Sequence, residues 1–226
     1  MSLRSVAASA GGAILADATQ GVAALRPARK PLHPRGEVLD GRLYRHGSDE
    51  TTGVAWLDEP GEDDAVVRRS RALGLPRSLP DIHGLAVRVR AGKGDDGDIL
   101  FATTGLGRVT RFFLTAARSP SSRPMTTLLP YDTDAGALLL AADGGPERYE
   151  LSWARASGEW HHFGVLLLSR RTEESEISFD PLMHQIEGLR QYPSVRRLRS
   201  PAYVRARRSR ADTDTDTTTE ENHHVH

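Results

Sequence analysis

The sequence contains no cysteine among its 226 residues. This absence excludes disulfide bonds, thiolate-bound metals, iron–sulfur clusters and a cysteine nucleophile. Lysine is almost missing as well, because 28 of the 30 basic residues are arginine. The 30 basic residues balance 30 acidic ones, so the chain carries no formal net charge. A globally basic nucleic-acid coat and an acidic disordered chaperone are thereby excluded.

Long hydrophobic runs are also missing. The longest, around residues 135–142, is far too short to span a bilayer. The N-terminal segment has neither the basic start nor the unbroken apolar stretch of a signal peptide. We therefore expect a cytoplasmic protein with no membrane partner. The hydrophobic fraction of 38% is low, but it suffices for the core of one domain once the polar ends are set aside.

Changes in amino-acid composition along the sequence predict three regions. Residues 1–28 are rich in alanine and glycine and are expected to form an N-terminal arm. Residues 29–210 are expected to form one domain, whose arginine-dense part, 180–210, covers it as helical or extended pieces. Residues 211–226 are of low complexity and are predicted to be disordered.

Short apolar-patterned segments alternate with turn signals through the middle of the chain, which is the pattern of antiparallel strands. About seven such strands favour a barrel or a sandwich. The Gly-Leu-Gly sequence at 105–107 is predicted to be a hairpin turn. The segments with strand-like patterns are 37–44, 64–71, 84–90, 98–103, 108–114, 149–156 and 160–170, and an apolar run lies at 137–142.

One tyrosine lies in the arginine-rich segment near the C-terminus. Arg199 precedes Tyr203 by four residues, so on a helix the guanidinium would lie one turn away on the same face. A cation in that place favours the phenolate form of a tyrosine. A phenolate is one of the recognised axial ligands of haem iron.

Five segments resemble, in their order along the chain, the motifs of the haem-containing catalases in a shortened form. The family motifs are V-V-H-A-[KR]-G, V-R-F-S, R-D-P-R-G-F-A-V, D-L-V-G-N-N-T-P-x-F-F and R-L-F-x-Y-x-D-T-x-R-x-R. The last of these keeps the spacing of its Arg, Tyr, Arg and Arg in this chain. The phenylalanine pair of the fourth motif matches Phe112 and Phe113, which come a little later than in the family. The five segments are PLHPRG (31–36), VRRS (67–70), PDIHGLAV (80–87), DILFATT (98–104) and RSPAYVRARRSR (199–210).

This resemblance implies an α+β protein with a largely antiparallel closed β-barrel and flanking helices. It also implies a haem b cofactor and hydrogen peroxide or an organic hydroperoxide as substrate. His33 would be the distal acid–base group, with Ser70 as its hydrogen-bond partner. Tyr203 would ligate the haem iron, and Arg199 would keep it ionised. Three further basic residues match positions that hold haem propionates in the family, namely Lys30, Arg68 and Arg210.

The sequence departs from the family pattern where peroxide is oriented. The distal asparagine of the family falls on Ala102 or Thr103, so its amide is missing. Loss of one such hydrogen-bond donor typically costs on the order of a hundredfold in rate. We therefore expect a peroxidase-like activity more than that of an efficient catalase.

Two other functions stay open. The barrel could lack the cofactor and bind a partner through its arginine-rich segment, or it could hydrolyse a phosphoester with these arginines as a clamp. The absence of a metal-ligand pattern counts against the hydrolase. Few aromatic residues interleave with the arginines, so a nucleic-acid partner is not expected. Assembly into a homo-oligomer stays open.

Other polar clusters have simpler interpretations. His161 and His162 are adjacent on a predicted strand, so they point to opposite faces and cannot bind one metal ion. The acidic residues of segment 58–64 are predicted to lie in a solvated turn, because they lack the spacing of a calcium loop. The three tryptophans are predicted to pack in or on the barrel.

Overall fold

The computed structural model describes residues 36–76, 78–90, 96–171 and 177–197. Strands dominate these residues, and the helical elements among them are short. The strands are β1 (Gly36–Arg45), β2 (Gly61–Arg71), β3 (His83–Arg90), β4 (Gly97–Thr103), β5 (Met125–Thr126), β6 (Tyr131–Thr133), β7 (Gly136–Gly144), β8 (Arg148–Arg155), β9 (His161–Arg170) and β10 (Arg190–Gln191), with helix α2 (Ala55–Asp58) and the 3-10 turn η1 (Thr110–Phe112).

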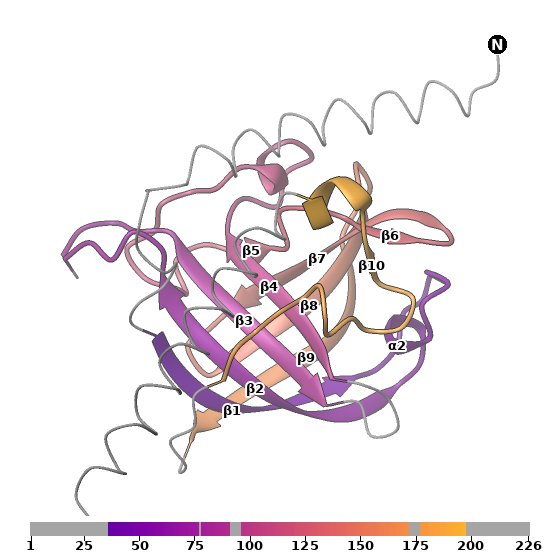
Figure 1. Ribbon diagram of the computed structural model, residues 1–226, viewed down its shortest axis with the longest axis horizontal. Helices are drawn as coiled ribbons and strands as arrows, with labels where there is room; N and C mark the ends of the chain where they lie inside the picture. The colour runs from indigo at the N-terminus through magenta and orange to yellow at the C-terminus, as the bar shows by residue number, and fades with distance from the viewer. Residues whose placement is uncertain (1–35, 77, 91–95, 172–176, 198–226) are drawn as a thin grey trace, which may run out of the picture. The chain divides into compact units, whose positions relative to one another are not determined.

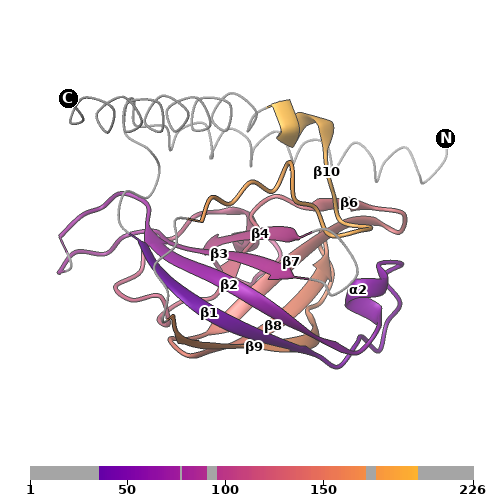
Figure 2. The same ribbon diagram turned by 60° about the horizontal axis from the view of Figure 1, so that its bottom comes forward.

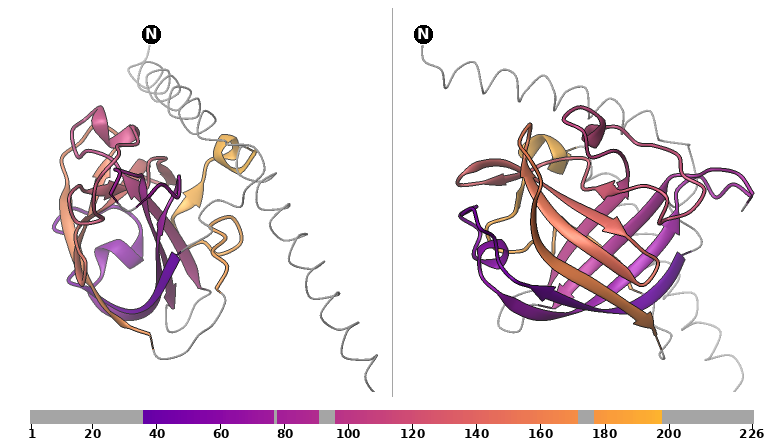
Figure 3. Two further views of the ribbon diagram at one scale, coloured as in Figure 1. Left: turned by 90° about the vertical axis from the view of Figure 1, so that its left-hand side faces the viewer. Right: turned by 180° about the vertical axis from the view of Figure 1, so that it is seen from behind.

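Eight of the strands close into an antiparallel barrel (Figure 1, Figure 3). Their order is β7-β5-β4-β3-β2-β1-β9-β8, and β8 pairs back onto β7. Strands β6 and β10 extend the sheet from β7 outside this ring. Closure gives every strand of the ring two neighbours and so removes exposed sheet edges. The predicted closed antiparallel barrel is confirmed.

The core fills the inside of the barrel through the alternation of side chains along each strand. On β3, Leu85, Val87 and Val89 point inward and are at most 2% exposed. Trp153 on β8 and Phe163 on β9 fill the opposite wall and are equally buried. The apolar alternation that predicts the strands is therefore the same alternation that builds the core.

Strands β1 and β9 approach each other closely at one glycine. A Cβ atom on Gly164 of β9 would lie 2.6 Å from the backbone oxygen of Tyr44 on β1. No real side chain tolerates that distance, so the backbone would have to move. Glycine at this position therefore allows the barrel to close along this seam.

The predicted strand at 108–114 is wrong. This part of the chain contains the 3-10 turn η1 inside a long loop, so the Gly-Leu-Gly sequence before it is not a hairpin turn. The cause is Arg111, whose buried guanidinium donates hydrogen bonds to the carbonyls of Leu106, Gly107 and Arg155. The same guanidinium lies 4.5 Å from the ring centre of Trp160. An extended backbone could not bring its own carbonyls around this side chain.

The prediction of a solvated acidic turn is wrong for two carboxylates. Asp58 accepts hydrogen bonds from the backbone N–H and hydroxyl of Thr52, at 2.8 Å each. Asp63 is buried and accepts hydrogen bonds from Arg45 at 2.7 Å and from the indole N–H of Trp56 at 3.1 Å. The acidic run extends into β2, which begins at Gly61. Because side chains alternate between the two faces of a strand, Asp63 points inward.

Most residues of the two ends of the chain lie outside the described structure. Contacts divide the chain after Tyr192, and residues 193–197 of the second unit are helical. The predicted N-terminal arm (1–28) and disordered tail (211–226) lie outside the described residues. None of the described helices is both long and apolar enough to cross a membrane.

Candidate functional site

Two of the predicted site residues, Arg68 and Ser70, lie within the described structure. Both stand on β2, which passes along one wall of the barrel (Figure 2). The other predicted site residues lie outside the described residues, so their predicted roles stay predictions. They are Lys30, His33, Arg199, Tyr203 and Arg210.

Arg68 and Ser70 project from the outer surface of the barrel. Ala65 and Val67 on the same strand are buried in the core, so the alternation of a strand turns residues 68 and 70 outward. Both residues are half-buried. The sequence predicts a shared site for these two residues, and the structure places them on one face, two residues apart.

The residues beside this pair have small or apolar side chains. Ser70 pairs with Gly84 on β3, and Gly84 pairs with Ala102 on β4. Arg68 pairs with Ala86, which has Leu100 on its other side. On the neighbouring strand β1, Gly36 pairs with Ser70 and Val38 pairs with Arg68. We call this surface the small-residue face, and its members are Gly36, Val38, Arg68, Ser70, Gly84, Ala86, Leu100 and Ala102.

The small-residue face ends at a covered ion pair one step further along β3 and β4. Arg88 binds both oxygens of Asp98 at 2.7 Å each, and this hydrogen bonding raises the pKa of Arg88. Arg88 also donates to the backbone oxygen of Ser178 and lies 5.5 Å from the ring centre of Phe179. Asp98 accepts the backbone N–H of Asp180 at 2.6 Å. The segment around 178–180 therefore covers the sheet here.

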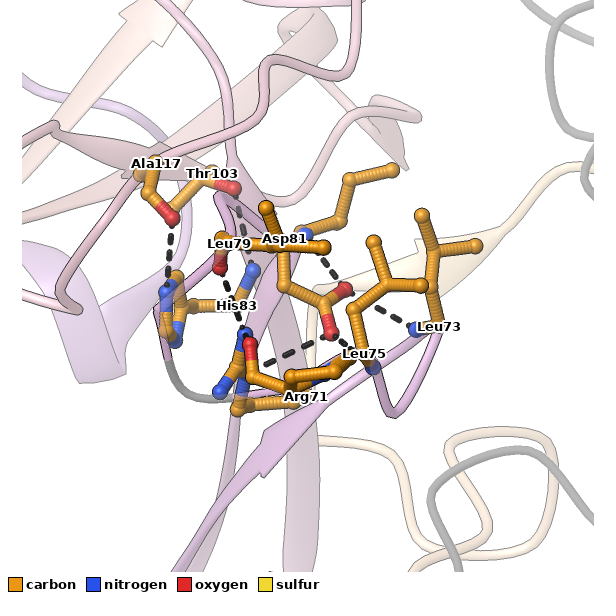
Figure 4. Close-up of polar contacts among 10 residues, drawn as sticks. Arg71, Leu73, Leu75, Leu79, Asp81, His83, Thr103 and Ala117 are labelled. Atoms are coloured by element: carbon orange, nitrogen blue, oxygen red, sulfur yellow. Dashed lines mark hydrogen bonds and ion pairs between the residues drawn. The ribbon is translucent and has the colours of Figure 1, made fainter.

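A buried carboxylate organises the loop next to the other end of the face (Figure 4). Asp81 is fully buried and accepts the backbone N–H groups of Leu73, Leu75 and Ile82 at 2.7–3.1 Å. The guanidinium of Arg71 lies 3.3 Å away. Burial alone would raise the pKa of Asp81, but these three donors and the cation hold it below its ordinary value.

His83 lies beside this carboxylate at the start of β3 (Figure 4). Its Nε2 atom is 3.0 Å from the backbone oxygen of Ala117, and a carbonyl only accepts, so Nε2 carries a proton. Burial lowers the pKa of His83, and the nearby cation of Arg71 acts in the same direction. His83 is therefore neutral near pH 7, with an unprotonated Nδ1 atom.

Sequence reasoning assigned no role to Asp81 or His83, although both lie in the segment that resembles R-D-P-R-G-F-A-V. The available signal was an acidic residue between a proline and the start of a predicted strand. Such a carboxylate often binds backbone amides of its own turn. Its partners here include loop residues up to eight positions earlier, which local patterns do not reveal.

Ala102 and Thr103, the two residues that the resemblance matches to the family's distal asparagine, point to opposite sides of the sheet. Thr103 points into the barrel, where its hydroxyl donates to the backbone oxygen of Thr115 at 2.7 Å and accepts the backbone N–H of His83. Ala102 stands on the small-residue face. The small-residue face therefore carries a methyl group where the resemblance would place an amide.

The paired histidines on β9 contact different partners. The ring of His161 stacks on Trp153, with ring centres 4.5 Å apart. His162 instead contacts His46 at 2.7 Å and also hydrogen-bonds Glu150. These separate partners confirm that the two histidines do not share a site. No group of three or more metal-ligating side chains that could hold an ion occurs among the described residues.

Comparison with known proteins supports the fold. No protein-family model and no curated protein sequence matches this chain. The solved structure of a bacterial catalase superposes with a TM-score of 0.57 at 12% sequence identity. The match covers 82% of this chain and 57% of that catalase, so the chain spans little more than half of the catalase's length. The barrel and its strand order therefore have a catalase-like fold.

Proposed function

We propose that this chain is a haem-binding protein of catalase-like fold that reacts with hydrogen peroxide or organic hydroperoxides, in a peroxidase-like manner. One observation carries the proposal: the small-residue face, with Arg68 and Ser70 on it, lies on the outside of a catalase-like barrel. A haem bound on this face would supply the iron chemistry that cleaves the peroxide O–O bond.

The described residues fit a haem group. The macrocycle is flat and mostly apolar, and its propionates are carboxylates. Gly84, Ala86 and Ala102 have no side chain beyond Cβ, so a flat group can approach the sheet closely, and Leu100 adds an apolar contact. The guanidinium of Arg68 suits a carboxylate, which it can bind through two parallel hydrogen bonds.

The residues outside the described structure complete the proposal. His33 would accept the proton of the peroxide and return it to the leaving oxygen, and the hydroxyl of Ser70 would orient its ring. Tyr203 would bind the iron as a phenolate, which the cation of Arg199 favours. Lys30 and Arg210 would join Arg68 at the propionates; these roles come from the resemblance of their segments.

Ala102 sets the expected substrate preference. A methyl group cannot donate a hydrogen bond to a peroxide, whereas an amide can. Dismutation of hydrogen peroxide should therefore be slower by on the order of a hundredfold than with an amide donor. The Ala102→Asn variant should raise dismutation relative to the oxidation of an added electron donor.

Titration of the full-length protein with hemin, followed by its absorption spectrum, tests the proposal. We expect saturation at one hemin per chain and a Soret band that changes in Tyr203→Phe. Arg68→Ala should weaken hemin binding, whereas the matched control Arg90→Ala, an exposed arginine at the far end of β3, should not. A folded protein without saturable binding would refute the haem proposal and favour the cofactor-free binding module.

A further inference from the structure

Exposed apolar side chains gather on two loops of the barrel. The loop between β2 and β3 (72–82) carries Leu73, Leu75 and Leu79, which are 46%, 39% and 48% exposed. The loop between β4 and β5 (104–124) carries Val109 and Phe113, which are 67% and 54% exposed. These five are most of the eight exposed large hydrophobic residues in the described part of the chain. We call the two segments the apolar loops.

The two apolar loops meet at one end of the barrel, while residues 106–111 of the longer loop reach Arg155 and Trp160 near the β8–β9 turn. Strand β2 ends, β3 begins and β4 ends there, because Arg71 pairs with His83 and Gly84 pairs with Ala102. A backbone bridge between Asp81 and Ala117 joins the two loops through hydrogen bonds of 2.9 and 2.8 Å. Figures 1 and 2 show the β2–β3 loop projecting from the barrel on this side.

The β2–β3 loop is held in shape from within. Besides the three N–H groups bound by Asp81, the guanidinium of Arg71 donates to the backbone oxygens of Pro76 and Leu79 at 3.2 and 2.8 Å (Figure 4). Several polar backbone groups of the loop are thus satisfied inside the protein while the leucines face outward. A surface of this kind can enter an apolar medium without leaving those backbone groups unpaired.

The exposed charged side chains of the apolar loops are all positive among the described residues. Their only described carboxylate is Asp81, which is buried. Arg108, Arg118 and Arg123 are exposed, and none of them forms an ion pair with a described residue. At this end of the barrel, the exposed carboxylates of Asp143 and Glu147 lie at the neighbouring β7–β8 turn, outside the two loops. The apolar loops therefore combine exposed apolar side chains with unpaired cations.

We propose that the apolar loops dock on a lipid bilayer that contains anionic phospholipids. The leucines and Phe113 would enter the boundary between headgroups and acyl chains, while Arg118 and Arg123 contact phosphates. A site for an apolar protein surface would not need three exposed arginines without a carboxylate among them. The inference does not depend on haem. It revises the expectation of no membrane partner, which rested on the absence of a spanning segment.

Co-sedimentation of the full-length protein with vesicles tests this inference. We expect binding to vesicles of phosphatidylcholine mixed with phosphatidylglycerol, little binding to phosphatidylcholine alone, and weaker binding as salt increases. Leu73→Asp with Leu79→Asp should reduce the affinity by about tenfold or more. Arg118→Ser and Arg123→Ser should each reduce it by about fivefold.

Matched substitutions at the other end of the barrel provide the controls. Met183 is 68% exposed and adjoins His184, whose backbone oxygen accepts the N–H of Asp98 at the start of β4. Met183→Asp and Arg90→Ser should leave vesicle binding unchanged. Circular dichroism checks that each variant is folded, and Phe113→Ser provides a second apolar-loop variant should the double leucine variant unfold.

Three results would overturn the inference. The first is wild-type protein that stays in the supernatant with anionic vesicles, and the second is apolar-loop variants that bind these vesicles as the wild type does. The third is a concentration-dependent dimer in light scattering that the Leu73→Asp and Leu79→Asp changes abolish, with no vesicle binding. That result would assign the apolar loops to a second copy of the chain. Hemin binding by the same samples is scored separately, so failure of the proposed function would not affect this test.

Discussion

Replacement of Asp81 should reveal how strongly one buried carboxylate stabilises the β2–β3 loop. Asp81→Ala removes the acceptor of three backbone N–H groups and the counter-ion of Arg71, all of which stay partly buried. Breaking a buried charge-assisted network of this kind costs about 3–5 kcal/mol. Since domains unfold with about 5–15 kcal/mol in total, the loss should be large. Asp81→Asn keeps one acceptor oxygen and should lose about half as much.

Urea unfolding at several pH values is the assay. Because the folded-state pKa of Asp81 is lowered, its contribution is present above the ordinary aspartate pKa of about 4 and is lost as the pH falls through the folded-state value. The difference between wild type and Asp81→Asn should thus be complete at neutral pH and shrink in acid. The matched control is Asp64→Asn, an exposed partner of Arg42, which should stay within about 0.5 kcal/mol.

Two outcomes would refute this reasoning. The first is an Asp81→Asn variant whose unfolding free energy at neutral pH equals that of the wild type. The second is a deficit that stays constant between neutral pH and the acid range, which would mean that the charge of Asp81 contributes nothing. An unchanged urea m-value is required for either comparison, since a changed m-value would signal a different unfolded state or a loss of two-state behaviour.

Two further substitutions test the packing of the barrel by urea unfolding. Arg111→Lys should destabilise the protein by about 2–4 kcal/mol, because three carbonyls are bound here by three separate guanidinium nitrogens, whereas all the donors of a lysine lie on one nitrogen atom. The exposed neighbour Arg108→Lys should be neutral, and an equal effect of both would contradict the role of Arg111. Gly164→Ala should cost about 2–3 kcal/mol, because its Cβ atom would lie 2.6 Å from the backbone oxygen of Tyr44. The control Gly158→Ala should change the unfolding free energy little, because its nearest contact would be at 3.4 Å. A Gly164→Ala protein as stable as the wild type would contradict the close approach of β1 and β9.

Local patterning predicted most of the barrel strands. On β3, alternating apolar and polar residues over 84–90 match a strand of nearly the same length, because period-two alternation is imposed by the strand itself. The start of β2 was predicted three residues late. Its first residues are acidic, and only the partner of Asp63, Arg45 on β1, makes an inward-facing carboxylate acceptable there.

The segment 108–114 shows where local patterning fails. Phe112 is buried and Phe113 is exposed, the same alternation that a strand would show. The conformation depends instead on Arg111, whose guanidinium stacks against Trp160 and bonds Arg155, both far along the sequence. Contacts between residues about 45–50 positions apart leave no trace in the local sequence.

The sequence by itself determined the strand alternation, the absence of thiol chemistry and the placement of Arg68 and Ser70 two residues apart on one strand. Each of these follows from residue type or from a period of two, which are properties of a short segment. Only the tertiary structure decided that Gly84, Ala86 and Ala102 adjoin that pair, that Asp81 binds the amides of its loop, and that the two apolar loops meet between Asp81 and Ala117. Strand register and barrel closure depend on pairing between distant segments, so these juxtapositions exist only in the folded chain.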